Sequence, residues 1–119
     1  AGVVAASRGA RRIALGPLAG NPFPDARPAF IAAMQEALSL GLDHAIEVAA
    51  PFSAMKKEGV IRLGVELGVP LELTLSCMNP VAPRDPDGLP LHCGQCSKCR
   101  ERRDAFRAAG VADLTRYAT

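Results

Sequence analysis

The stretch LHCGQCSKC, residues 91–99, contains three of the four cysteines of the chain, each separated from the next by two residues. The fourth, Cys77, lies sixteen positions before Cys93. Cysteines at this spacing can share one metal ion, because the intervening residues form a tight turn in which Gly94 relaxes the backbone. Four thiolates in a closed tetrahedral set are typical of structural zinc sites. The predicted zinc ligands are Cys77, Cys93, Cys96 and Cys99.

Two other uses of these cysteines stay open at this point. A C-x2-C-x2-C run with a further remote cysteine also occurs in ferredoxin-type iron–sulfur motifs. Disulfides would require an oxidising compartment, and the N-terminal sequence shows no signal-peptide pattern. His92 stands beside Cys93, and we expect it to be exposed or to support the site from outside the ligand set. The sequence therefore favours structural zinc over these alternatives.

The amino-acid composition is typical of one small globular domain with an aliphatic core. Of the 119 residues, 49% are apolar and 22% charged, and aromatic residues make up only 4%, with no tryptophan. The net charge of +2 is too small to indicate a nucleic-acid partner by itself. No apolar run is long enough to cross a bilayer. We therefore expect a cytoplasmic protein without a membrane partner and without nucleic acid.

Outward from the cysteines, strand and helix patterns alternate along the chain. The expected elements are strands at 13–15, 44–49 and 69–77 and helices at 28–40, 53–67 and 97–109. The expected boundary residues are Ser53 and Ser97 as N-caps and Gly41, Gly68 and Gly110 as helix ends. Apolar residues around the second helix predict burial on more than one face. Alternation of this kind indicates an α/β fold with a parallel sheet and crossover helices.

The connecting segments contain turn-forming residues. The chain opens on AGVVAASRGARRIALG, residues 1–16, which predicts the end of a helix, a turn at Gly9 and a strand. Because the chain begins inside an element and without methionine, we expect it to be cut from a longer protein. Residues 16–28 form a loop rich in glycine and proline, and residues 79–91 form an irregular excursion that folds back to bring Cys77 beside the cluster.

Three segments resemble the 7-cyano-7-deazaguanine synthase family of the QueC/ExsB type. They are NPFPDARPAF (21–30), PFSAMKKEGVIRLGVELGVPLELTLSC (51–77) and HCGQCSKCRERRDAFRAAGVADLTRY (92–117). The most specific part is S-C followed by C-G-x-C-x-x-C-x-x-R and then A-F-x-x-A-G. The resemblance covers nearly the whole chain.

The resemblance implies a fold, a reaction and a cofactor. The fold is a Rossmann-like, adenine nucleotide hydrolase-like parallel sheet, with residues 1–76 as its α/β part. Residues 77–119 are the zinc-binding loop and C-terminal helix of the same domain. The reaction is the ATP-dependent conversion of 7-carboxy-7-deazaguanine and ammonia to 7-cyano-7-deazaguanine in queuosine biosynthesis, catalysed by a carbon–nitrogen ligase. The four cysteines bind structural zinc, and ATP is a substrate of the full-length enzyme.

The chain departs from the family pattern in three places. The glycine-rich S-G-G-x-D-S phosphate loop does not occur in it, so we expect the chain alone to be inactive and not to bind ATP. Its expected partner is the N-terminal ATP-binding half of the same protein, and the sequence leaves a homodimer open. Phe23 and Ala26 replace tyrosine and cysteine, and Glu58-Gly59 replaces Ala-Glu. These changes indicate a divergent subfamily, and they leave open whether its deazaguanine-type substrate is 7-carboxy-7-deazaguanine or a related base.

Three side chains are candidates for contact with a deazaguanine-type substrate. Arg27 could clamp a carboxylate in two places, Asp25 could accept hydrogen bonds from a guanine-like edge, and Lys57 could reach an anion at a helix N-terminus. The competing interpretations are a helix cap for Asp25, a solvated Arg27 and an outer helix face for Lys57. If the sheet is parallel, we expect the zinc loop and the pair Asp25 and Arg27 to line opposite sides of one cleft.

A second class of function rests on the basic run after the cysteines. Its members are Lys98, Arg100, Arg102, Arg103 and Arg107. A zinc-stabilised module that binds RNA or a partner protein without catalysis is the alternative. Arg100, Arg103 and Arg107 share one face of a helix. Because no aromatic residues alternate with these cations and the net charge is only +2, we expect this face to be solvated, with Phe106 pointing away from it into the core.

Overall fold

The computed structural model describes residues 1–83 and 88–118, which belong to two compact units, Ala1–Lys56 and Lys57–Thr119. The boundary expected between residues 76 and 77 lies inside the second unit. That all residues form one domain stays a prediction. Within the described residues, no helix is both long enough and apolar enough to cross a membrane.

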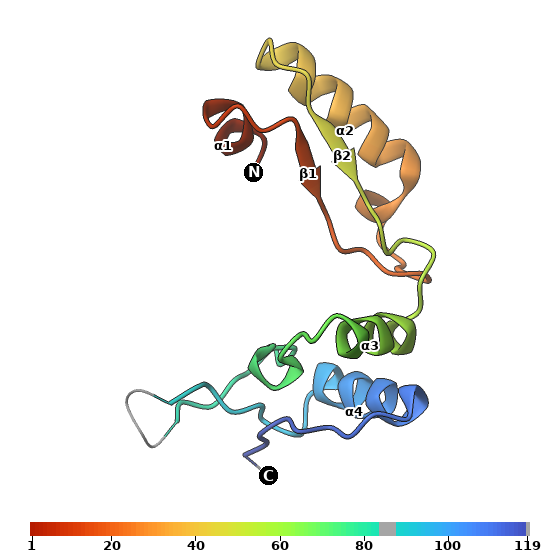
Figure 1. Cartoon of the computed structure of the whole chain (residues 1–119), viewed down its shortest axis with the longest axis vertical. Coiled ribbons are helices and arrows are strands. Elements are labelled where there is room, and N and C mark those ends of the chain that lie inside the picture. The colour runs from red at the N-terminus through yellow and green to blue at the C-terminus, as the bar shows by residue number, and fades with distance from the viewer. Residues whose placement is uncertain (84–87, 119) are drawn as a thin grey trace. The chain divides into compact units, whose positions relative to one another are not determined.

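The first unit is an α/β arrangement around a parallel pair of strands (Figure 1). Its elements are α1 (Gly2–Ser7), β1 (Arg12–Ala14), a 3-10 turn (Pro24–Ala26), α2 (Pro28–Gly41) and β2 (Glu47–Ala49). Ile13 lies opposite Val48 in the parallel register. Gly9 adopts a left-handed φ of 67° between α1 and β1, as expected for a turn. The sequence prediction of helix, turn, strand, helix and strand is confirmed here.

Helix α2 begins at Pro28, because proline fits the first helical position and needs no hydrogen-bond acceptor there. Its last residue is Gly41, as the sequence predicted. The cap residue Leu42 follows, and Asp43 after it adopts a left-handed φ of 47°.

The core of the first unit is thin and leaves an apolar groove. Ile31 and Ile46 are its buried hydrophobic residues. A groove of about 270 Å³ is lined by Ile13, Leu15, Phe30, Ile31, Met34, Leu38 and Val48, together with the first two residues of the chain. Phe30 and Met34 remain 45% and 40% exposed there. The Gln35 side chain accepts the Val48 N–H at 2.9 Å and so covers one edge of β2.

The second unit is a pair of helices that pack side by side (Figure 1). Helix α3 covers Lys57–Glu66, a 3-10 turn covers Leu71–Leu73 and helix α4 covers Ser97–Ala109. The buried centre between the helices consists of Ile61, Ala105 and Phe106, with Leu71, Ala109 and Val111 packed around it. The prediction that Phe106 points into the core is confirmed.

The strand predicted at 69–77 is wrong. The segment forms a 3-10 turn followed by extended chain, and the described residues contain a two-stranded sheet made of β1 and β2. Pro70 has no N–H to give to a neighbouring strand. Leu71 packs on α3 beside Gly64, where an added Cβ would lie 3.1 Å from a Leu71 methyl group. The close packing at Gly64 therefore holds this segment against α3.

Three details of the predicted helices also need correction. Helix α3 starts at Lys57, because Ser53 lies in a turn in which its N–H bonds to the Ala50 carbonyl. The N-cap of α4 is Cys96, and Ser97 is its first helical residue. Burial of α3 is one-sided, since Val65 and Leu67 are 51% and 71% exposed.

The C-terminal boundary of α4 agrees with the prediction. The helix ends at a left-handed Gly110 with a φ of 69°. The excursion at 79–91 also folds back as expected, because Val81 and Leu91 form an antiparallel bridge. Residues 84–87 of this excursion lie outside the described residues.

Candidate metal centre

The sulfur atoms of the four cysteines converge on one point, as the sequence predicted. The Sγ atoms of Cys77, Cys93, Cys96 and Cys99 all lie within 4.8 Å of one another. Three of the separations are 3.8 Å (Cys77 to Cys96), 3.9 Å (Cys93 to Cys99) and 3.5 Å (Cys96 to Cys99). Sulfurs around one tetrahedral zinc ion, with Zn–S bonds of about 2.3 Å, lie about 3.8 Å apart. All four are free thiols, so none is paired in a disulfide.

The four ligands come from two arms of the chain. Cys77 follows the Leu71–Leu73 turn on extended chain, whereas the other three belong to a tight turn and the start of α4. Gly94 provides the turn with a left-handed φ of 78°, as predicted from the spacing. Cys96 is the N-cap of α4 and Cys99, in the first turn of that helix, is fully buried. The three cysteines at 93–99 are thus positioned by local structure, whereas the position of Cys77 depends on tertiary contacts.

Backbone N–H groups surround the sulfurs. The Cys77 sulfur accepts hydrogen bonds from the N–H groups of Asn79 and Cys93, each at 3.3 Å. A bond from the Met78 N–H lowers the pKa of Cys96 to about 6, and burial raises the pKa of Cys99 to about 12. Because a thiol must lose its proton to bind a metal ion, metal binding by this cluster releases protons.

His92 is buried and supports the site from outside the ligand set, which is one of the two alternatives that the sequence left open. It is 3% exposed, and its Nε2 accepts the Ser76 N–H at 3.0 Å. Burial lowers the pKa of His92, and the nearby charge of Arg102 lowers it further. The bond from Ser76 requires an unprotonated Nε2, which this lowered pKa favours. The imidazole of His92, the residue before Cys93, therefore holds Ser76, the residue before Cys77.

Arg102 belongs to the basic run but lies outside the face that was predicted to be solvated, and it is buried. Its side chain is 5% exposed and donates four hydrogen bonds within the second unit. The acceptors are Thr115 Oγ1 at 2.6 Å, Thr74 Oγ1 at 2.9 Å, Ser76 Oγ at 3.1 Å and the Leu71 carbonyl at 2.8 Å. Arg103 is also engaged, since it donates to the Gly94 carbonyl at 2.8 Å and lies over the Tyr117 ring. Arg100 and Arg107 are exposed, as predicted.

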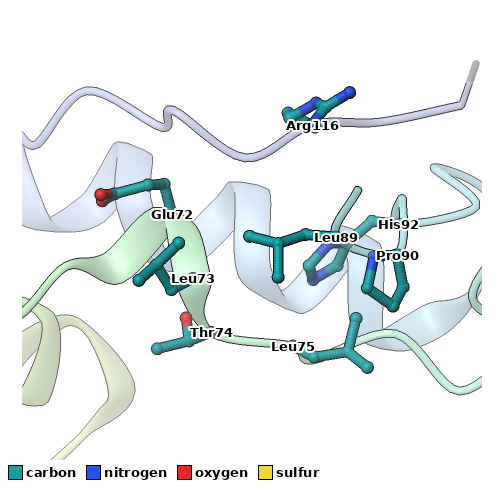
Figure 2. A pocket seen from close by; sticks show the side chains of 8 residues that line it. All are labelled: Glu72, Leu73, Thr74, Leu75, Leu89, Pro90, His92 and Arg116. Atoms are coloured by element: carbon teal, nitrogen blue, oxygen red, sulfur yellow. The ribbon is translucent and has the colours of Figure 1, made fainter. Parts of the chain in front are cut away.

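A small hollow lies beside His92 (Figure 2). Its volume is about 40 Å³, and Leu75, Leu89 and Pro90 form part of its wall. Figure 2 shows the His92 ring near Leu89 and Pro90, with Arg116 on a separate segment of the chain. A volume this small admits water but not a purine-sized ligand, which needs a pocket of about 300 Å³ or more.

Comparison with known sequences decides the family. Residues 1–110 match the sequence model described as queuosine biosynthesis protein QueC. The chain belongs to the QueC family. Within it, the chain is 43% identical over 95 residues to the 7-cyano-7-deazaguanine synthase of Methanopyrus kandleri. It is 40% identical over 115 residues to that of Caldicellulosiruptor bescii and 36% identical over 116 residues to that of Porphyromonas gingivalis.

These matches cover 80%, 95% and 96% of the chain. They cover 40%, 48% and 49% of the three synthases. The chain thus spans less than half of the length of the QueC relatives that it matches.

The three predicted substrate residues of this QueC chain occupy different places. Asp25 lies in the Pro24–Ala26 turn and Arg27 is the N-cap residue of α2, both exposed, and no side chain caps that helix. A capping role for Asp25 is therefore excluded. Lys57 is the first residue of α3 and lies 3.7 Å from the Glu101 carboxylate. The structure brings Asp25 and Arg27 together on one loop, whereas Lys57 belongs to the second unit.

Sequence reasoning missed the role of Arg102 and the hydrogen-bond partner of His92. Arg102 lies three residues after Cys99, and this spacing places both on the same face of a helix. A cation on the buried face of α4 was therefore a readable signal. Nothing in the sequence indicated that His92 would bond to Ser76, because that contact depends on the return of the chain after residue 79.

Proposed function

We propose that the chain is the C-terminal part of an ATP-dependent carbon–nitrogen ligase of queuosine biosynthesis. The full enzyme converts 7-carboxy-7-deazaguanine and ammonia to 7-cyano-7-deazaguanine. The observation that carries this proposal is the QueC match over residues 1–110, together with 7-cyano-7-deazaguanine synthases about 40% identical to the chain. The closed group of four sulfurs agrees with it.

In this proposal the metal is structural zinc. Four thiolates complete a tetrahedral shell, so no position on the ion remains for water or substrate. The ion would hold the Cys77 arm against the start of α4 and contribute to folding of the second unit. We place the protein in the cytoplasm, where reducing conditions keep such thiols free for metal.

The sheet supports a role for a further part of the enzyme. Parallel sheets are normally covered on both faces and contain more than two strands, because a two-stranded sheet buries too little apolar surface. Here Gln35 covers an edge of β2, whereas the other edge of β1 has no strand partner among residues 1–83 and 88–118. The apolar groove beside β1 and α2 is also open. We propose that the ATP-binding half of the full enzyme completes this sheet and groove.

Substrate contact is assigned to the loop after β1. This loop follows the carboxyl end of a parallel strand, the edge at which ligands bind in such sheets. Arg27 would hold the substrate carboxylate or a phosphate with its planar guanidinium, and Asp25 would accept hydrogen bonds from the base. Both side chains are exposed and no cap bond engages them. Lys57 would contribute a second positive charge at the start of α3.

The test is reconstitution of the full enzyme. The missing half of the C. bescii synthase is fused to this chain, and formation of 7-cyano-7-deazaguanine from 7-carboxy-7-deazaguanine, ammonia and ATP is followed by mass spectrometry. We expect product from the fusion, and Arg27→Met should reduce its rate by about 100-fold. The matched control Arg12→Met changes an exposed arginine on β1 that pairs with Glu47 and should retain the rate. A folded, zinc-loaded fusion without product would contradict the proposal.

The alternative is a zinc-stabilised module that binds RNA or protein. Its basic surface is smaller than the sequence suggested, because Arg102 and Arg103 are used inside the second unit. Tight binding of the isolated chain to RNA at physiological salt, with no activity of the fusion, would favour this alternative.

A further inference from the structure

Cys77, the fourth ligand of the metal centre, is not positioned by local structure. Cys93, Cys96 and Cys99 are held by a tight turn and one helix end, but Cys77 arrives on extended chain without a strand partner among the described residues. An unrestrained arm would lose conformational entropy whenever its cysteine bound the ion, which weakens the site. The structure therefore needs contacts that fix the Cys77 arm before metal binding.

The Arg102 guanidinium donates hydrogen bonds to this arm. Three of its four hydrogen bonds end on residues 71–76, at Leu71, Thr74 and Ser76. The fourth ends on Thr115, and the Asp113 carboxylate lies 4.0 Å from Nε, which balances the buried charge. Because Arg102 lies on α4 one turn after Cys99, it connects the helix of one ligand to the arm of another.

His92 makes a second, independent connection. Its Nε2 accepts the N–H of Ser76, which directly precedes Cys77, while His92 itself directly precedes Cys93. The backbone of His92 is fixed by bonds to Arg116 and Ala118, at 2.9 and 2.8 Å, and its ring meets the Tyr117 ring edge to face. Figure 2 shows the ring within the wall of the small hollow, near Leu89 and Pro90. The two arms of the site are thus joined by an imidazole in a setting that admits little water.

We propose that Arg102 and His92 are positioning residues that hold the Cys77 arm in its ligating place and thereby set the metal affinity of the four-cysteine site. This inference rests on the zinc centre of the proposed function. Neither side chain ligates the ion, since the sulfur cluster contains cysteines alone. Their bonds end on Leu71, Thr74 and Ser76, so their loss frees the arm and leaves the other three ligands in place.

The test measures zinc affinity of the 119-residue chain by competition with a chromophoric chelator. The variants are Arg102→Met and His92→Phe, which remove the donors and the acceptor while keeping side-chain size. We expect each to weaken zinc binding by about tenfold or more. His92→Gln, whose amide oxygen can accept the Ser76 N–H, should recover most of the loss. Arg107→Met is the matched control, because Arg107 is a 78% exposed cation on the same helix, and its ion pair with Asp104 does not involve the Cys77 arm.

A second readout separates positioning from general stability. Cobalt(II) in the site reports the number of bound thiolates through its sulfur-to-cobalt absorption. In Arg102→Met and His92→Phe we expect this absorption to fall by the contribution of one thiolate, as Cys77 detaches, while helix content by circular dichroism stays that of the parent chain. If Arg102→Met does not fold, His92→Phe and Arg102→Lys carry the same test.

Unchanged zinc affinity and unchanged cobalt spectra in folded His92→Phe would overturn the inference, as would an equal loss in Arg107→Met. The failure of the proposed function is distinguishable from this outcome. If the parent chain itself binds neither zinc nor cobalt, the zinc centre is wrong. If the parent binds and the variants bind equally well, only the positioning role is wrong.

Discussion

The pKa of the Asp113 carboxyl group is determined by its neighbours. Burial alone would raise its pKa, but hydrogen bonds from Thr115 and Tyr117 outweigh burial and lower it. The Thr115 N–H donates at 3.0 Å and the Tyr117 hydroxyl at 2.8 Å. Arg102 adds a positive charge 4.0 Å away. The carboxylate thus stabilises the segment that follows α4 in its charged form.

The lowered pKa of Asp113 predicts a pH dependence. A carboxyl whose folded pKa lies below its ordinary value of 3.8 contributes stability above that pH and loses it as the pH falls further. We expect Asp113→Asn to reduce the free energy of unfolding by about 1–2 kcal/mol at pH 7. Urea unfolding of both proteins at pH 7, 5 and 3.5 checks this. The difference should shrink at pH 3.5, and a difference independent of pH would contradict it.

At the scale of elements, helix α4 forms because local and tertiary signals agree. Cys99 and Arg102 lie one turn apart, and Phe106 continues the same buried side of the helix. Phe106 is 3% exposed and packs against Ile61 of α3. The helix pair therefore depends on one large side chain in a chain with few aromatic residues.

Removal of the Phe106 ring should be costly. We expect Phe106→Ala to lower the free energy of unfolding of the zinc-loaded chain by about 3–4 kcal/mol, because the cavity cannot be filled by neighbours of this size. Leu114→Ala is the control, since Leu114 is 70% exposed and its truncation should cost less than about 0.5 kcal/mol. Chemical denaturation measures both. Equal losses in the two variants would show that the α3–α4 contact is not the centre of this unit.

The sequence predicted α2, α4, β1, β2 and the convergence of the cysteines, because each has a local signal. Helices are bounded by proline or glycine, and the ligands have a fixed spacing. The prediction of a strand at 69–77 was wrong because the alternating leucines do not show which residues they pack against. Leu71 packs on α3, whereas Leu73 and Leu75 are 58% and 52% exposed. Arg102 donates a hydrogen bond to the Leu71 carbonyl. The two residues are 31 positions apart in the sequence, so no local pattern predicts this contact.

At the scale of the whole molecule, the chain spans less than half of its relatives' length. The glycine-rich S-G-G-x-D-S phosphate loop of the family pattern does not occur in the sequence of the chain. We therefore expect no heat of binding when the 119-residue chain is titrated with ATP and magnesium. The fusion with the missing half should bind ATP, with a Kd of about 1 mM or tighter. Binding of ATP by the isolated chain would contradict this division of roles.

The metal content of the chain tests the four-cysteine zinc centre most directly. Metal analysis combined with X-ray absorption on the purified chain should give about one zinc per chain with four sulfurs at about 2.3 Å. Chelation of that ion should also loosen residues 93–110, seen as faster amide hydrogen exchange, because metal binding contributes folding energy here. Iron with inorganic sulfide, or zinc with fewer than four sulfur ligands, would contradict the four-cysteine zinc centre.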